Sequence, residues 1–172
     1  MKEKEIQSRH ETAVLKKFNK YFRATGKELN IISNPQPPDA IVTIDGNEAW
    51  IEITDAFFSP ELAESMTSSI ATNKLHRPIP RKKQFVTDPD QVFCNELCKV
   101  ILKKYDKKSI KEVYKLRGKG ILLVGVINPF SWAEEVAATE KNTILNAIKS
   151  KEQFFSEMYL YDYNANGFYA IL

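Results

Sequence analysis

Apolar residues along the chain recur in two spacings, which predict a protein that alternates helices with strands. An unbroken apolar run over residues 120–127, bounded by glycine and by Asn128-Pro129, predicts a strand buried on both faces. Spacings of three and four residues predict helices over 4–24, 61–75 and 89–105, and one or two more within 131–150. Shorter apolar stretches predict strands at 29–33, 157–163 and 168–172.

Residues 38–54 predict a β-hairpin. Asp45-Gly46 is a strong signal for a two-residue turn, because a type I′ turn needs positive φ at both central positions. With that turn, Ile44 pairs with Asn47, and counting outward places Asp39 opposite Glu52. A turn at Gly46-Asn47 would instead pair Asp39 with Thr54.

The first of these registers brings two carboxylates together. Paired residues on one sheet face have Cβ atoms roughly 4.5–5.5 Å apart, so Asp39 and Glu52 would repel unless a proton or a cation lay between them. Mg²⁺ takes one or two carboxylates together with water and phosphate oxygens. Thr54 projects to the same face as Glu52. The alternative is that both carboxylates are solvated at the ends of an ordinary hairpin.

Two charged residues occupy positions where the helical pattern calls for apolar ones. Glu11 falls on the stripe of Leu15 in the first helix, and Lys104 falls between Leu97 and Val100 on the wheel of the 89–105 helix. A charge on an inward face needs a partner. We therefore expect both side chains to lean over the hairpin carboxylates. The alternatives are that Glu11 caps a frayed first turn and that Lys104 extends past its helix to water.

Composition indicates an ordinary folded domain. The 172 residues carry a net charge of +3, contain no apolar run long enough to cross a membrane, and open without a hydrophobic signal region. We therefore expect a cytoplasmic protein with no membrane partner. Cys94 and Cys98 lie four apart in a helix, which predicts two free thiols rather than a disulfide or a zinc site. Neither His10 nor His76 belongs to a recognisable catalytic motif, and we expect both at the surface.

Basic residues are concentrated in two segments. Residues 76–83 contain two prolines and no periodicity, which predicts a loop, and residues 99–119 hold nine Lys or Arg against two acidic residues. Such segments suit nucleic-acid phosphates, although exposed basic residues are often only solvated. The candidate contacts to nucleic acid are Arg77, Arg81, Lys82, Lys83, Lys107 and Lys108.

The order of these elements predicts one domain over residues 1–172, a three-layer α/β/α sandwich with a central mixed sheet. No glycine-rich loop follows a strand, which argues against a nucleotide-binding doubly wound fold.

The constellation resembles the PD-(D/E)XK nuclease superfamily, which has the restriction-endonuclease-like fold. The matching residues are Glu11 on the first helix, Asp39 after Pro38, and Glu52 in Glu52-Ile53-Thr54. The resemblance implies hydrolysis of phosphodiester bonds, most naturally in DNA, with Mg²⁺ or Mn²⁺ held by Asp39, Glu52 and the Ile53 carbonyl. Glu11 would be a further ligand or an acceptor behind the ligands.

The chain departs from the family pattern at Thr54, where the family has lysine. The family's lysine sometimes migrates to the next helix, and Lys104 is the candidate here. Otherwise the site is degenerate, and the protein is a nuclease-like module that binds nucleic acid or a protein partner. A symmetric homodimer would suit a double-strand cutter, because one site cuts one strand.

Overall fold

The sheet and its helices follow the predicted order closely. A computed structural model describes residues 3–71, 75–83 and 86–172 of the chain. Its elements in chain order are α1 (Glu3–Ala24), β1 (Leu29–Ser33), β2 (Ala40–Ile44), β3 (Asn47–Phe57), α2 (Pro60–Ile70), the 3₁₀ helix η1 (Arg81–Lys83), α3 (Pro89–Asp106), α4 (Lys108–Arg117), β4 (Gly120–Ile127), α5 (Ala133–Ile148), β5 (Phe155–Asp162) and β6 (Phe168–Ala170).

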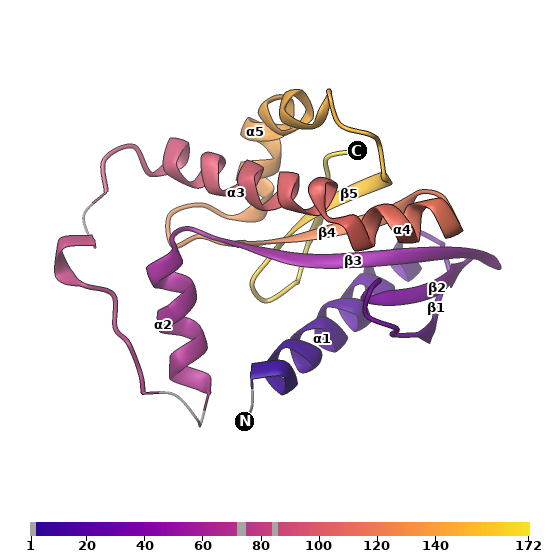
Figure 1. Cartoon of the computed structure of the whole chain (residues 1–172), viewed down its shortest axis with the longest axis horizontal. Coiled ribbons are helices and arrows are strands. Elements are labelled where there is room, and N and C mark those ends of the chain that lie inside the picture. The colour runs from indigo at the N-terminus through magenta and orange to yellow at the C-terminus, as the bar shows by residue number, and fades with distance from the viewer. Residues whose placement is uncertain (1–2, 72–74, 84–85) are drawn as a thin grey trace.

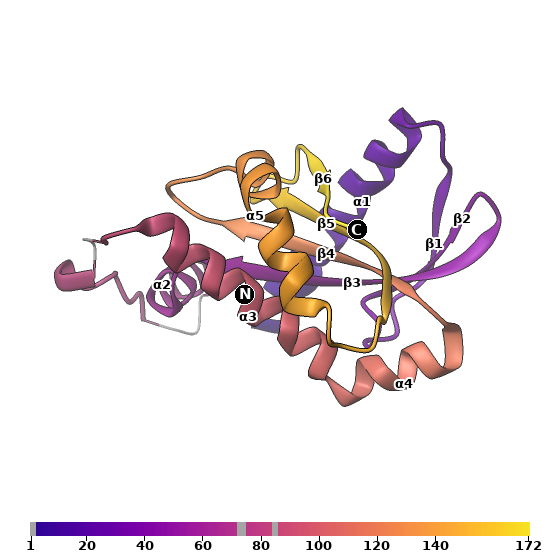
Figure 2. The same ribbon diagram turned by 90° about the horizontal axis from the view of Figure 1, so that it is seen from above.

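The strands form one mixed six-stranded sheet in the order β1-β2-β3-β4-β5-β6. The first three strands are antiparallel, β3, β4 and β5 are parallel, and β6 returns antiparallel to β5. Every residue of β4 is buried, as its unbroken apolar run predicts. The protein is therefore an α/β protein with an open mixed sheet (Figure 2).

Helices cover both faces of this sheet (Figures 1 and 2). On one face α1 buries Phe18 and Phe22 against an apolar core. On the other face a second core includes Trp50 of β3, Leu97 of α3 and Ile144 of α5. Charged residues on the inner sides of α1 and α3 therefore approach the sheet from opposite faces.

The β2–β3 hairpin has the predicted turn. Asp45 and Gly46 both have positive φ, at 50° and 83°, and Ile44 pairs with Asn47. The alternative turn at Gly46-Asn47 is wrong. The register that brings Asp39 toward Glu52 is thus fixed by a backbone conformation that glycine adopts without strain.

Several other elements differ from the sequence prediction. Helix α2 ends at Ile70 rather than near Leu75, and residues 72–74 lie outside the described part of the chain. The 131–150 segment forms a single helix, α5. Helix α4 was not predicted, because its charged sequence shows only a short apolar stripe. That stripe buries Ile110 and Val113.

Two further sequence predictions concern membranes and cysteines. Among the described residues, no helix combines the length and the apolar character that crossing a bilayer requires.

Cys94 and Cys98 are both free, as predicted, with Cys94 buried and Cys98 half-buried. Burial raises the pKa of the Cys94 thiol well above its usual range, so that this thiol stays protonated and inert.

Candidate functional site

The candidate site lies at the open end of the hairpin, just before β2 begins, where β3 continues past it. The outermost paired residues of these strands are Ala40 and Ile51. Asp39 comes just before β2, and its Oδ2 accepts a hydrogen bond of 2.7 Å from the backbone N–H of Ile53. The hairpin therefore holds the Asp39 carboxyl group against β3, one residue from Glu52.

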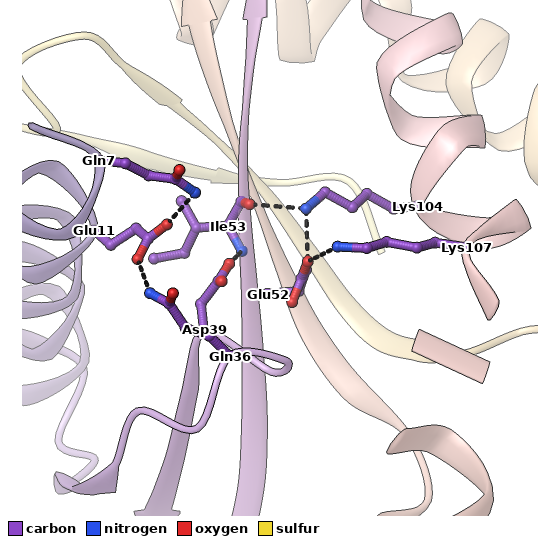
Figure 3. A network of polar contacts seen from close by, with 8 residues as sticks. All are labelled: Gln7, Glu11, Gln36, Asp39, Glu52, Ile53, Lys104 and Lys107. Carbon is purple, nitrogen blue, oxygen red and sulfur yellow. Dashed lines mark hydrogen bonds and ion pairs between the residues drawn. The ribbon is translucent and has the colours of Figure 1, made fainter. Parts of the chain in front are cut away.

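Lys104 reaches this strand from the opposite face. Its ammonium, on α3, donates to Glu52 Oε1 at 2.6 Å and to the backbone carbonyl of Ile53 at 3.2 Å (Figure 3). The prediction that Lys104 points inward toward the hairpin is confirmed. Lys107 adds a weaker ion pair, with its Nζ 3.7 Å from the same Glu52 oxygen.

Glu52 is the most deeply buried acidic residue of the site, with only 1% of its surface exposed. Both lysines approach Oε1, whereas the buried Oε2 has no hydrogen-bond partner among the described residues. A buried carboxylate oxygen without a partner is costly, and a ligand that supplies positive charge would satisfy it.

The Asp39 carboxyl group is the one whose ionisation is most disturbed. Burial, followed by the negative charge of Glu52, raises the pKa of Asp39 to about 6. Glu11 also raises this pKa, while the hydrogen bond from Ile53 and the charge of Lys104 lower it. Asp39 and Glu52 therefore repel each other as carboxylates, as expected from their register, and a cation between them would relieve the repulsion.

Glu11 is buried, as predicted, but it lies on the α1 side of β3, opposite to Glu52 and Lys104 (Figure 3), so the expectation that it leans over the face that holds Glu52 is wrong. Its Oε1 accepts a hydrogen bond from Gln7 and its Oε2 accepts one from Gln36, each 2.8 Å long (Figure 3). The alternative that Glu11 caps a frayed first turn is wrong, because Glu11 lies in the middle of α1 and is 6% exposed. With both oxygens held by amides, it faces Asp39 as a fixed negative charge.

The other residues that we predicted for the site differ in how close they lie to it. Thr54 is half-buried on β3, paired with Val124. Arg77 forms an ion pair of 2.6 Å with Glu64 of α2 rather than with the hairpin. Three predicted basic residues have exposed side chains without a contact to the site among the described residues, and the side chain of a fourth lies outside the described part of the chain. The exposed residues are Arg81, Lys82 and Lys108, and the fourth is Lys83.

The donor chemistry suits a hard divalent cation. Asp39, Glu52 and the Ile53 carbonyl supply only oxygen, and the unpartnered Glu52 Oε2 is free to coordinate. The described residues contain no group of three or more His, Cys, Asp or Glu side chains placed to hold a metal. An ion at this position would therefore keep several water or phosphate ligands, as Mg²⁺ commonly does.

Sequence reasoning missed a second polar cluster beside this site. His10 Nε2 lies 2.9 Å from Asp55 Oδ2, and the Tyr161 hydroxyl donates to Asp55 Oδ1 at 2.8 Å. His10, which we expected at the surface, is half-buried, with 28% of its side chain exposed. Alternation along β3 was an available signal, because it places Asp55 on the same face as Ile53, toward α1.

We compared the chain with known proteins in three ways. No protein-family model, no curated protein and no solved structure matches it. Its candidate function therefore rests on the geometry of its own residues.

Proposed function

We propose that this protein is a nuclease that depends on Mg²⁺ or Mn²⁺, hydrolyses phosphodiester bonds of DNA, and has a restriction-endonuclease-like fold. One observation carries the proposal. The Lys104 ammonium lies beside Glu52 and the Ile53 carbonyl, and Glu52 Oε2 has no partner among the described residues. This is the arrangement expected if a lysine from a later helix, α3, replaces the one missing at Thr54.

The order of elements also supports the proposal. An N-terminal helix with an inward glutamate is followed by an antiparallel β1–β2–β3 meander, then by helices and a parallel β4. This is the order on which the resemblance to the PD-(D/E)XK superfamily depends.

The residues have distinct roles in this proposal. Asp39, Glu52 and the Ile53 carbonyl would hold the cation, which would polarise a phosphoryl oxygen and favour ionisation of the attacking water. The water oxygen attacks phosphorus and releases a proton to solvent, and the bond from phosphorus to the leaving oxygen breaks as that oxygen takes up a proton from solvent. Lys104 orients Glu52 and places a positive charge where negative charge develops on the phosphoryl group. Glu11 fixes the orientation of Gln36, beside Asp39.

Plasmid cleavage in Mg²⁺ or Mn²⁺ tests the proposal. We expect Glu52→Gln and Asp39→Asn each to lower the cleavage rate by at least about a hundredfold, because each removes a charge that acts at the reacting phosphate. Calorimetry should show Mn²⁺ binding that Glu52→Gln abolishes. Glu48→Gln is the matched control, because Glu48 is an exposed glutamate on the same strand. Cleavage that survives both substitutions at the site would exclude it as the catalytic site.

A specific observation also favours a second candidate, a nuclease-like module that binds nucleic acid without cleaving it. Lys104 and Lys107 already neutralise Glu52 Oε1, so this carboxylate is partly compensated without a metal. This candidate predicts DNA binding that weakens steeply with salt, no turnover, and no measurable affinity for Mn²⁺.

A further inference from the structure

Two neighbouring depressions lie along the carboxyl ends of the parallel strands. One has a volume of about 520 Å³ and the other about 390 Å³, and both are lined by Met66, Ile127 and Tyr163. Figures 1 and 2 show α2 and the loop from β4 to α5 at this same end of the sheet. Ligands of open α/β sheets commonly bind in the crevice outside the carboxyl ends of the strands.

Exposed aromatic side chains border the smaller depression. Trp132, in the loop after β4, is 70% exposed, and Tyr163, directly after β5, is 56% exposed. Two exposed rings at one depression offer flat apolar faces to a ligand. Nucleobases stack on such rings with little regard to sequence, because every base has a π-face.

An unsatisfied hydrogen-bond donor lies in the lining of the same depression. Asn128 Oδ1 accepts a hydrogen bond from the Phe130 N–H at 2.9 Å, which fixes the amide. Asn128 Nδ2 then remains buried without a partner among the described residues, in the lining that includes Trp132. A donor beside aromatic rings suits a planar ligand with acceptors on its edge, and carbonyl oxygens and ring nitrogens of bases are such acceptors.

The larger depression brings two basic side chains together with one carboxylate. His10 and Lys4 line it beside Asp55, whose Oδ2 lies 2.9 Å from His10 Nε2. The His10 ring and the Lys4 ammonium are the groups here that can donate hydrogen bonds to a backbone phosphate. The sheet itself makes room for the Asp55 carboxylate that pairs with His10. A Cβ at position 125 would lie 2.1 Å from Asp55 Oδ1, and the residue there is glycine.

We infer that this groove binds an unpaired stretch of a nucleic-acid strand, with bases stacked on Trp132 and Tyr163 and a backbone phosphate at His10. Bases within a duplex already stack on one another and cannot present their faces to these rings. The inference rests on the proposed function in taking nucleic acid as the ligand. It adds that the substrate contains a single-stranded segment beside the site of cleavage.

The test measures binding without catalysis, by fluorescence anisotropy in EDTA. The probes are a fluorescein-labelled 12-nucleotide single strand of mixed sequence, its duplex, and the same strand with abasic residues. We expect Trp132→Ala and Tyr163→Ala each to weaken binding of the single strand by about tenfold. Leu116→Ala should have no effect, because Leu116 is an apolar residue that is even more exposed, at 79%, and it lies on α4 at the other end of the molecule.

The abasic strand separates stacking from charge. It keeps the phosphates, so we expect the wild-type protein to bind it about tenfold more weakly than the intact strand. The Trp132→Ala/Tyr163→Ala variant should not distinguish the two strands. Equal wild-type affinity for the intact and abasic strands, tighter binding of the duplex, or no binding of the single strand would overturn the inference.

The outcomes distinguish this inference from the proposed function. Suppose that cleavage requires Glu52 but that substituting Trp132 and Tyr163 leaves binding of the single strand unchanged. This result would overturn the inference about the groove and would still support the proposed nuclease. Suppose instead that binding of the single strand depends on Trp132 and Tyr163, but that the protein neither cleaves DNA nor binds Mn²⁺. This result would overturn the proposed nuclease and would still support the inference about the groove. Circular dichroism of each variant checks that these exposed substitutions leave the fold intact.

Discussion

Lys104 and Glu52 depend on each other because both are largely withdrawn from water. The exposed fractions of their side chains are 16% and 2%. Removing one partner of a buried pair leaves the other charge uncompensated, which costs far more than the pair contributes as a whole. Removing the Lys104 charge alone, or the Glu52 charge alone, is therefore expected to lower the free energy of unfolding.

This dependence predicts an asymmetric response to substitution. Lys104→Met should lower the free energy of unfolding by about 3 kcal/mol, because it leaves Glu52 buried with only the more distant Lys107 beside it. The double variant Lys104→Met/Glu52→Gln should recover most of that loss. Urea denaturation measures both.

Lys103→Met is the matched control, since Lys103 is an exposed lysine on the same helix. It should change stability by less than about 0.5 kcal/mol. A single Lys104→Met variant as stable as this control would contradict the buried pair.

His10 provides a pH-dependent prediction. The hydrogen bond to Asp55 raises the pKa of His10 above 6.5, and partial burial opposes this less strongly. The stabilisation by the His10–Asp55 pair is therefore fully present below pH 6.5 and is lost as the pH rises through the raised pKa of the folded state.

NMR titration of the His10 ring measures this shift. Asp55→Asn should lower the pKa of His10, because it removes the carboxylate that favours the imidazolium. A His10 pKa that Asp55→Asn leaves unchanged would contradict the pairing.

At the scale of elements, the β2–β3 turn determines which residues meet. Gly46 has a φ of 83°, and no heavy atom lies within 4 Å of the position that a Cβ would take. We expect Gly46→Ala to lower the free energy of unfolding by about 1 kcal/mol, entirely through backbone strain. Urea denaturation should show no comparable loss for Asn47→Ala, the exposed neighbour. Equal stability of the two variants would argue against a strained turn.

The elements differ in how far the sequence could predict them. The hairpin and the inward Lys104 follow from local rules, namely a turn dipeptide and a helical period. Helix α4 does not follow from local rules, because its stability comes from packing Ile110 and Val113 under a mostly charged surface. The His10–Asp55–Tyr161 cluster joins three separate elements, and nothing local to any of them signals the other two.

At the scale of the whole molecule, the sheet separates two apolar cores, and the site lies between them. Glu11 approaches the site from the face whose core packs against α1, and Lys104 approaches it from the face whose core packs against α3. The sequence predicts the α/β class and the mixed sheet because buried and amphipathic segments differ in pattern. It could not predict which loops would meet at the carboxyl edge, because that depends on the strand order.

The packing of α1 has a consequence for synthesis on the ribosome. Phe18 lies with its ring centre 5.3 Å from that of Tyr159 and 4.9 Å from that of Phe168. The first helix therefore completes its core only after the last strands have emerged. At roughly 5–20 residues per second, its apolar face waits about 7–30 s for them. During that interval the newly made helix offers to chaperones the same aromatic surface that it later buries.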